Sequence, residues 1–176
     1  MSKIYIIGIV ASGKTTLSRK MAKMTHVKAY ELDEVVWPLV NGQQVKRTPA
    51  EQLDELQRID NTGSWIIEGT YRKNCRSVLD NADQIVFLDP PLLLRCVRIV
   101  TRFIKQQLKL ETCRYKSDLK MLRWMFEWTV EFEKDRDRFN NLLKPYEEKL
   151  IVLKRKKEIK NYMNQLGDQY ETEITG

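Results

Sequence analysis

Residues Gly8 to Thr15 read Gly-Ile-Val-Ala-Ser-Gly-Lys-Thr, which matches the pattern G-x-x-x-x-G-K-[ST] and directly follows the apolar run Ile4–Ile7. This pattern, between a strand and a helix, is typical of a phosphate-binding loop. Gly8 and Gly13 let the backbone turn where a side chain would clash, so that successive N–H groups point into one concavity. The motif therefore predicts a strand–loop–helix unit that binds a polyphosphate.

The residues at the end of the motif have separate chemical roles. Lys14 would bring a positive charge to the β and γ phosphates, and the Thr15 hydroxyl can enter the shell of a magnesium ion. The dipole of the helix expected from Lys14 to about Met24 favours an anion at the same place. We therefore expect ATP and Mg2+ as cofactors. The residues expected to bind the nucleotide are Gly8, Ala11, Ser12, Gly13, Lys14, Thr15 and Thr16. The alternative is a turn that binds nothing.

The length of 176 residues suits one compact domain. We expect this domain to span residues 1–167, and residues 168–176 to form a polar, frayed tail. A hydrophobic share of 42% is enough for a sizeable core. No apolar run approaches the ~18 residues that a membrane helix needs, so no membrane contact is expected. The sequence leaves the oligomeric state open.

Cysteine and histidine usage narrows the chemistry. The three cysteines show no C-x-x-C spacing, which predicts free thiols and a cytoplasmic protein. His26 is the single histidine, which argues against a histidine-based zinc site and against a serine–histidine catalytic triad. The net charge of +7 makes nucleic acid a possible partner, but no nucleic-acid-binding motif accompanies it. We favour a polyphosphate site together with a solvated basic run at Lys154–Lys157.

Short apolar stretches alternate with helical segments along the chain, which predicts a three-layer α/β fold with a parallel sheet covered on both faces. The predicted strands are Lys3–Ile7, Val27–Leu32, Trp65–Glu68, Gln84–Leu88 and Leu150–Leu153. The predicted helices are Lys14–Met24, Ala50–Asn61, Tyr71–Leu79, Leu92–Leu110, Lys116–Leu143 and Lys156–Gln165. The two long helices form a helical lid at about residues 92–143.

Three acidic residues end predicted strands. Asp33, Glu68 and Asp89 would lie on the same rim as the loop, because ligands of open parallel sheets bind outside the carboxyl ends of the strands. Asp89 is the expected magnesium-assisting acid beside Thr15. The residues expected to bind the second substrate are Asp33, Glu68, Gly69, Tyr71 and Arg72. For each acid, a helix-capping or salt-bridging role stays open.

The first lid helix carries a cationic stripe. Arg95, Arg98 and Arg102 are spaced i, i+3 and i+7, so they share one helix face. One interpretation is a set of guanidinium groups that closes over the transferring phosphoryl group, and the other is a solvated basic face. Residues 111–116 would form the tip of a mobile lid, with Arg114 as its main contributor. The expected catalytic residues are Lys14, Asp33, Arg98, Arg102 and Arg114.

The order of these motifs resembles a known family. The phosphate-binding loop, Leu32-Asp33, Trp65–Tyr71, Leu88–Pro91 and the arginine-bearing helix are similar to the adenylate-kinase-like P-loop proteins labelled "DNA topology modulation protein" (FlaR-like). The similarity runs to about Leu166 and implies a sheet order of 2-3-1-4-5 and a relationship to nucleoside and nucleotide kinases. That family usually has Asp-Gly-Asn-Tyr where this chain has Glu68-Gly69-Thr70-Tyr71, which keeps a carboxylate and loses an amide.

The sequence thus predicts a small ATP-dependent phosphotransferase. The γ-phosphoryl group would pass to a small-molecule acceptor, through a hydroxyl or a phosphate, near Asp33 and Glu68. Two alternatives remain at this point. One is a nucleotide-dependent switch that hydrolyses slowly and acts through a partner, and the other is a nucleic-acid-binding protein with a secondary ATP site.

Overall fold

The computed structural model describes residues 2–111 and 117–175. Its centre is a five-stranded parallel sheet in the order β2-β5-β1-β6-β7. The strands are β1 (Lys3–Gly8), β2 (Ala29–Glu31), β5 (Trp65–Gly69), β6 (Gln84–Leu88) and β7 (Leu150–Leu153). Numbered by themselves in chain order, these strands give the predicted order 2-3-1-4-5, which is confirmed.

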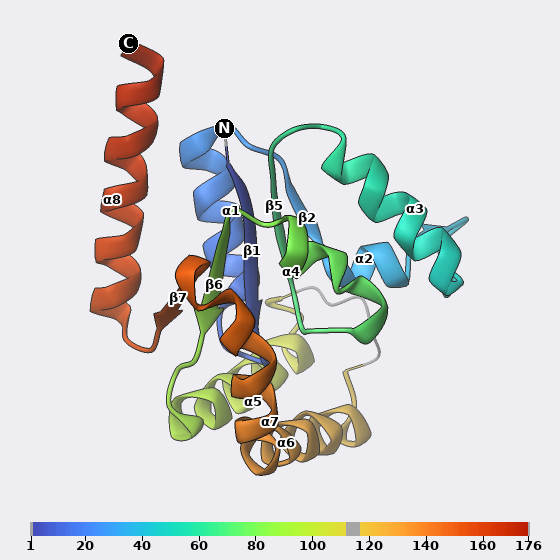
Figure 1. Cartoon of the computed structure of the whole chain (residues 1–176). Coiled ribbons are helices and arrows are strands. Elements are labelled where there is room, and N and C mark those ends of the chain that lie inside the picture. The colour runs from blue at the N-terminus through green and yellow to red at the C-terminus, as the bar shows by residue number, and fades with distance from the viewer. Residues whose placement is uncertain (1, 112–116, 176) are drawn as a thin grey trace.

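Helices cover both faces of the sheet (Figure 1), so the predicted three-layer arrangement is confirmed. The helices are α1 (Lys14–Thr25), α2 (Leu32–Val36), α3 (Pro49–Asp60), α4 (Ser77–Asn81), α5 (Leu92–Gln107), α6 (Leu119–Lys134), α7 (Arg136–Leu143) and α8 (Lys156–Thr175). Two 3-10 helices, η1 (Lys73–Cys75) and η2 (Lys144–Lys149), and a small hairpin of β3 (Leu39–Val40) and β4 (Gln43–Gln44) complete the described elements.

Alternation of side chains along β1 divides the core into two layers. Ile4 and Ile6 pack with α1 and α8 on one face of the sheet. Tyr5 and Ile7 pack with α2, α3, α4 and α7 on the other face. Burial of β1, β5 and β6 on both faces explains why these three strands are mostly apolar.

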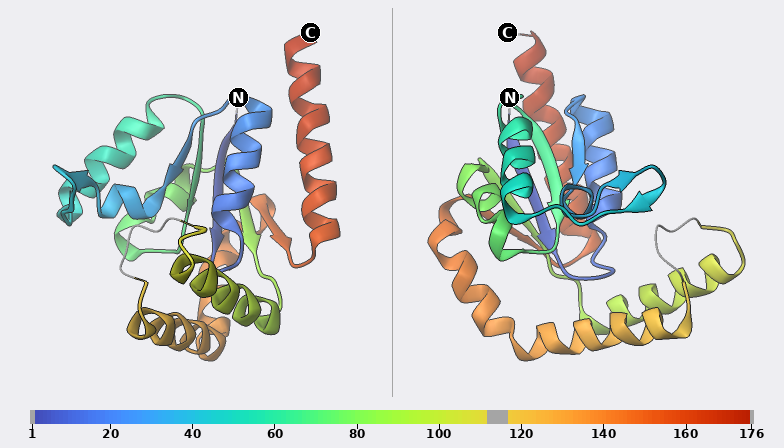
Figure 2. Two further views of the ribbon diagram at one scale, coloured as in Figure 1. Left: turned by 180° about the vertical axis from the view of Figure 1, so that it is seen from behind. Right: turned by 90° about the vertical axis from the view of Figure 1, so that its right-hand side faces the viewer.

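The two helices predicted to form a lid lie beyond the carboxyl ends of the strands (Figure 1 and Figure 2). Helices α5 and α6 lie side by side there, and α7 turns back toward the sheet (Figure 2). None of the helices in residues 2–111 and 117–175 is long and apolar enough to cross a membrane.

Three helix predictions need correction. The helix expected at Tyr71–Leu79 cannot begin before Lys73, because the backbone at Arg72 is extended, and the segment forms two short helices, η1 and α4. The helix expected at Lys116–Leu143 breaks at Asp135 into α6 and α7. This break lets Phe132 and Phe139 both pack on Phe87, at ring-centroid distances of 6.5 and 5.1 Å. Burial of these rings decides the turn, since no glycine or proline marks it.

The third correction concerns the C-terminus. Helix α8 runs to Thr175, so the segment expected to be a frayed tail is helical to that residue. The reason is packing: Tyr162 and Leu166 are buried against the core, and Tyr170 packs on the same cluster one turn later. Apolar side chains at 3-4 spacing therefore continue beyond the predicted end at Gln165.

Candidate functional site

The loop between β1 and α1 has the backbone that a phosphate cradle needs. Ala11 and Gly13 have positive φ values of 57° and 105°, so two left-handed residues turn the chain within three positions. A Cβ at Gly8 would lie 2.8 Å from the Leu88 carbonyl oxygen and 2.7 Å from Ser12 Oγ, so only glycine fits there. Ser12 Oγ is buried and has no hydrogen-bond partner among the described residues. These features fit a bound polyphosphate.

Lys14 lies half-buried at the end of this loop. Its Nζ donates to the Ile9 carbonyl at 2.9 Å. Burial lowers the pKa of Lys14, an effect that the charges of Glu68 and Asp33 oppose and the charge of Arg102 reinforces. Charged residues from α2, β5 and α5 are therefore within electrostatic reach of Lys14 at the start of α1.

Glu68 is the acid that meets the loop. The register Ile6↔Glu68 and Ile7↔Gly69 between β1 and β5 brings it beside the start of α1, and Thr15 Oγ1 donates to Glu68 Oε1 at 2.5 Å. Glu68 is 5% exposed. Burial raises the pKa of its carboxyl group, while Lys14 and the Thr15 hydrogen bond act in the opposite direction.

Asp33 and Arg72 form an ion pair across the rim. Arg72 Nη2 donates to Asp33 Oδ1 at 2.7 Å, and the Asp33 side chain is largely exposed. A Cβ at Gly69 would lie 2.5 Å from Leu32 Cβ, so this glycine lets α2 pack against the end of β5. Gly69 thus acts through packing, by holding the Asp33 helix close to Glu68.

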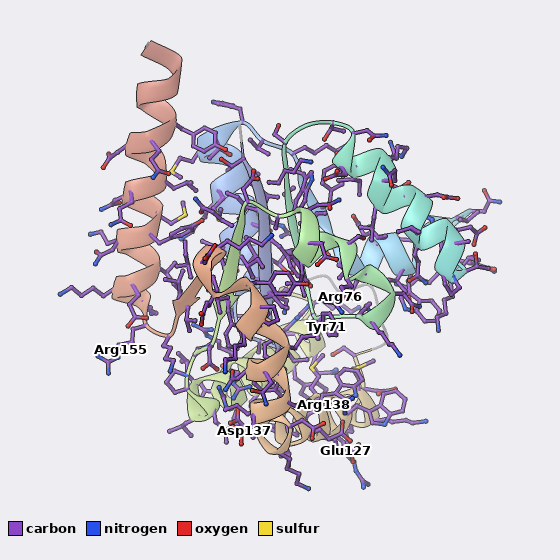
Figure 3. All side chains as sticks on the ribbon, in the orientation of Figure 1. Tyr71, Arg76, Glu127, Asp137, Arg138 and Arg155 are labelled. Carbon is purple, nitrogen blue, oxygen red and sulfur yellow. The ribbon has the colours of Figure 1, made fainter. Side chains whose placement is uncertain are left out.

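Tyr71, also predicted to bind substrate, is partly buried and packs against the core cluster that contains residues of α2 and α4. Figure 3 shows Tyr71 after the end of β5, and Arg155 where α8 begins.

Asp89 has a different partner from the predicted one. It is 8% exposed, and its Oδ2 accepts from Arg136 Nη1 at 2.8 Å. The contact that Thr15 makes is with Glu68. A magnesium role for Asp89 stays a prediction. No group of three or more histidine, cysteine, aspartate or glutamate side chains that could hold a metal occurs in the described part of the chain.

The lid arginines have three different environments. Arg95 is fully buried and bonds Glu133 on α6. Arg98 Nη1 donates to the carbonyls of Ala11 and Ser12 in the phosphate-binding loop, at 3.1 and 2.9 Å. Arg102 lies 3.6 Å from Glu111 and acts on the pKa of Lys14. A solvated basic face is therefore wrong for Arg95 and Arg98. Arg114 lies outside the described residues.

A cavity of about 250 Å3 lies next to the phosphate-binding loop. It is lined by Ser12 of the loop, Pro90, Leu94 and Arg98 at the base of the lid, and the segment after β7. A second cavity, of about 340 Å3, lies between α2, α3 and the β3–β4 hairpin and has no lining residue from the loop.

The buried carboxylate of Glu68 leads to a prediction for stability. Its pKa in the folded state is raised above the ordinary 4.5, so the folded state binds the proton more tightly than the unfolded chain does. This group therefore lowers stability as the pH rises from about 4.5 through the raised pKa. The variant Glu68→Gln resembles the protonated form, and it should unfold at a higher urea concentration than the wild type at pH 7.5 and at an equal one near pH 4.

The matched control for this experiment is Glu148→Gln, which removes an exposed carboxylate and should leave both midpoints unchanged. A Glu68→Gln variant that is less stable than the wild type at pH 7.5 would contradict the assignment, because the attraction of Lys14 and the Thr15 hydrogen bond would then outweigh burial of the charge.

The sheet order and the loop together define a P-loop kinase fold, and three solved structures illustrate it. A gluconokinase from Sinorhizobium meliloti 1021 shares 14% identity over 99% of this chain and 96% of its own, with a TM-score of 0.52. A shikimate kinase from Bacteroides thetaiotaomicron shares 15% identity over 96% and 97%, with a TM-score of 0.52. The deoxyadenosine kinase of M. mycoides with bound dATP shares 16% over 94% and 99%, with a TM-score of 0.50.

At these identities the similarity shows the fold alone. No protein-family model and no curated protein matches the chain.

Proposed function

We propose that this protein is an ATP-dependent phosphotransferase that moves the γ-phosphoryl group to a small-molecule acceptor held beside Asp33 and Glu68. The observation that carries the proposal is the cluster at the end of β1 and β5, where Lys14 and Thr15 of the loop meet the buried Glu68. Phosphoryl transfer depends mainly on positioning and charge neutralisation, and this cluster supplies both. The kinase folds of similar shape support the same class of reaction.

The nucleotide would lie along the loop. The loop amides and Lys14 would bind its phosphates, and the cavity beside Ser12 and Arg98 would receive its base. The oxygen atoms of Thr15 and Glu68 lie together beside the loop and could coordinate a magnesium ion. Asp89 is the acidic residue that the sequence predicts to assist this ion. When bound, the metal would neutralise negative charge on the β and γ phosphates.

Asp33 is the proposed partner of the acceptor. For a hydroxyl acceptor, its oxygen would attack the γ phosphorus as the bond to the β-phosphate oxygen breaks, and the exposed Asp33 carboxylate would take the hydroxyl proton. For a phosphate acceptor no base is needed, and Asp33 and Arg72 would serve in binding. Arg98, Arg102 and Arg114 are the proposed groups for the charge on the transferring oxygens.

A screen for acceptor-dependent release of ADP tests the proposal. Purified protein with ATP and magnesium should release ADP faster when the correct nucleoside, nucleotide or hydroxylated metabolite is present, and its phosphorylated form should appear in equal amount. Gluconate, shikimate and deoxyadenosine are informative first members of the panel. Slow ADP release that no acceptor accelerates would instead favour the nucleotide-dependent switch.

We include the relationship to the FlaR-like proteins in this proposal. Most of the motifs that the two share lie around the phosphate-binding loop and Glu68. We also propose a cytoplasmic location. Cys75 and Cys96 are free thiols, as expected in a reducing compartment.

A further inference from the structure

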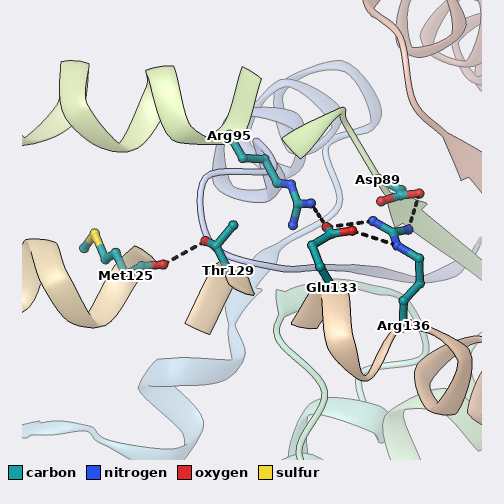
Figure 4. Close-up of polar contacts among 6 residues, drawn as sticks. All are labelled: Asp89, Arg95, Met125, Thr129, Glu133 and Arg136. Atoms are coloured by element: carbon teal, nitrogen blue, oxygen red, sulfur yellow. Dashed lines mark hydrogen bonds and ion pairs between the residues drawn. The ribbon is translucent and has the colours of Figure 1, made fainter. Parts of the chain in front are cut away.

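A chain of charged side chains runs from the end of β6 to helix α5 (Figure 4), and α5 itself contacts the phosphate-binding loop. This chain begins at Asp89, directly after β6, whose carboxylate accepts from Arg136 of α7. Arg136 also donates to both carboxylate oxygens of Glu133 on α6, at 3.1 and 2.9 Å. Glu133 in turn accepts from Arg95 of α5. Four elements are thereby joined by one line of ion pairs.

Glu133 is the central member of this chain. Hydrogen bonds from Arg136 and then Arg95 lower the pKa of Glu133, which keeps it charged. Arg95 has no exposed surface, and its Nε and Nη1 have no partner among the described residues. Its guanidinium lies 5.6 Å from the Phe132 ring centroid. Glu133 is therefore the acid that compensates a buried charge, and removing it would leave that charge uncompensated.

The same helix contacts the loop one turn later. Arg98 follows Arg95 on α5 and donates to the Ala11 and Ser12 carbonyls. In a planar trans peptide the N–H points away from the C=O of the same unit. Because Arg98 binds the Ser12 carbonyl, the N–H of Gly13 points away from Arg98. The position of α5 therefore influences the direction in which the backbone N–H groups of the loop point.

We propose that Glu133 is a positioning residue for nucleotide binding. Together with Asp89 and Arg136 it holds α5 so that Arg98 keeps the phosphate-binding loop in its binding-competent form. Arg98 then acts on the loop backbone, in addition to any contact with the phosphoryl group. This inference rests on the proposed function insofar as the loop binds a nucleoside triphosphate.

A double-mutant cycle on ATP affinity tests the inference. Glu133→Gln should weaken ATP binding about tenfold in calorimetry, because the competent form of the loop would fall to about one tenth of the population. In an Arg98→Ala background the same change should weaken binding less than twofold, since the connection to the loop is already broken. Repeating the ATP titrations in EDTA measures the affinity of the loop for ATP in the absence of magnesium. A purely structural role would lower the melting temperature in both backgrounds without this dependence on Arg98.

Controls separate the possible outcomes. Glu131→Gln removes an exposed carboxylate from the same helix and should leave ATP affinity unchanged. If Glu133→Gln does not fold, Asp89→Asn breaks the chain at its other end and should show the same dependence on Arg98. If ATP affinity falls equally in both backgrounds, or does not fall in the wild-type background, the inference about Glu133 is wrong, while the proposed function is unaffected. A wild-type protein that binds no ATP would refute the proposed function itself.

Discussion

Replacement of Lys14 by alanine should reduce ATP affinity by roughly 100-fold or more, because charge-assisted hydrogen bonds contribute about 1.5–3 kcal/mol each. Lys14 is the cation of the phosphate-binding loop, and its burial leaves it few solvent partners to replace a phosphate. Calorimetry with ATP and magnesium measures the loss directly. The same variant should release no ADP above background in the presence of any acceptor.

A control variant and a second expected change show whether the effect is particular to Lys14. Lys20→Ala removes an exposed lysine from the same helix and should bind ATP like the wild type. The pKa of Glu68 should rise further in Lys14→Ala, because the lysine charge now holds it down. ATP binding and turnover close to those of the wild type would remove the basis of the kinase proposal.

Replacement of Arg102 by alanine should lower kcat by about 10³-fold while the affinity for ATP changes less than about threefold. Arginines that neutralise charge in the transition state of phosphoryl transfer are worth about 10³–10⁵ in rate. Arg102 helps to lower the pKa of Lys14, so its charge acts at the lysine that we propose binds the β and γ phosphates. Steady-state kinetics with the identified acceptor, together with calorimetry, separates the two effects.

Lys105→Ala is the matched control, since this lysine is exposed on the same helix. An equal loss in kcat and in ATP affinity for Arg102→Ala would indicate ground-state binding in place of a transition-state role.

Short-range patterns were enough to predict the sheet. The central strands β1, β5 and β6 are buried on both faces, so their apolar runs are nearly continuous, and the glycines of the loop mark the turn after β1. The capping box of Thr48 and Glu51, with Pro49 as the first helical residue, likewise starts α3 one residue before the predicted start at Ala50. These signals depend on neighbours in the sequence, which is why they could be read without a structure.

The lid was predicted less well. The break at Asp135 has no glycine or proline, and it follows from the packing of Phe132 and Phe139 on a strand residue far away in the sequence. Glu133, which we propose as a positioning residue, was not singled out from the sequence, although a carboxylate on the apolar face of a helix is a signal that an ion pair lies beneath it.

The sequence by itself determined the phosphate-binding loop, the alternation of strands and helices, and the rim on which Asp33, Glu68 and Asp89 lie. Only the tertiary structure decided which acid meets Thr15 and which arginine reaches the loop. The register of β1 against β5 brings Glu68 to the loop, while α7 brings Arg136 to Asp89. The end of a strand fixes the position of the acidic residue that follows it. The residue that binds this acid comes from the helix or loop that packs over the strand end, and that packing depends on contacts between residues far apart in the sequence.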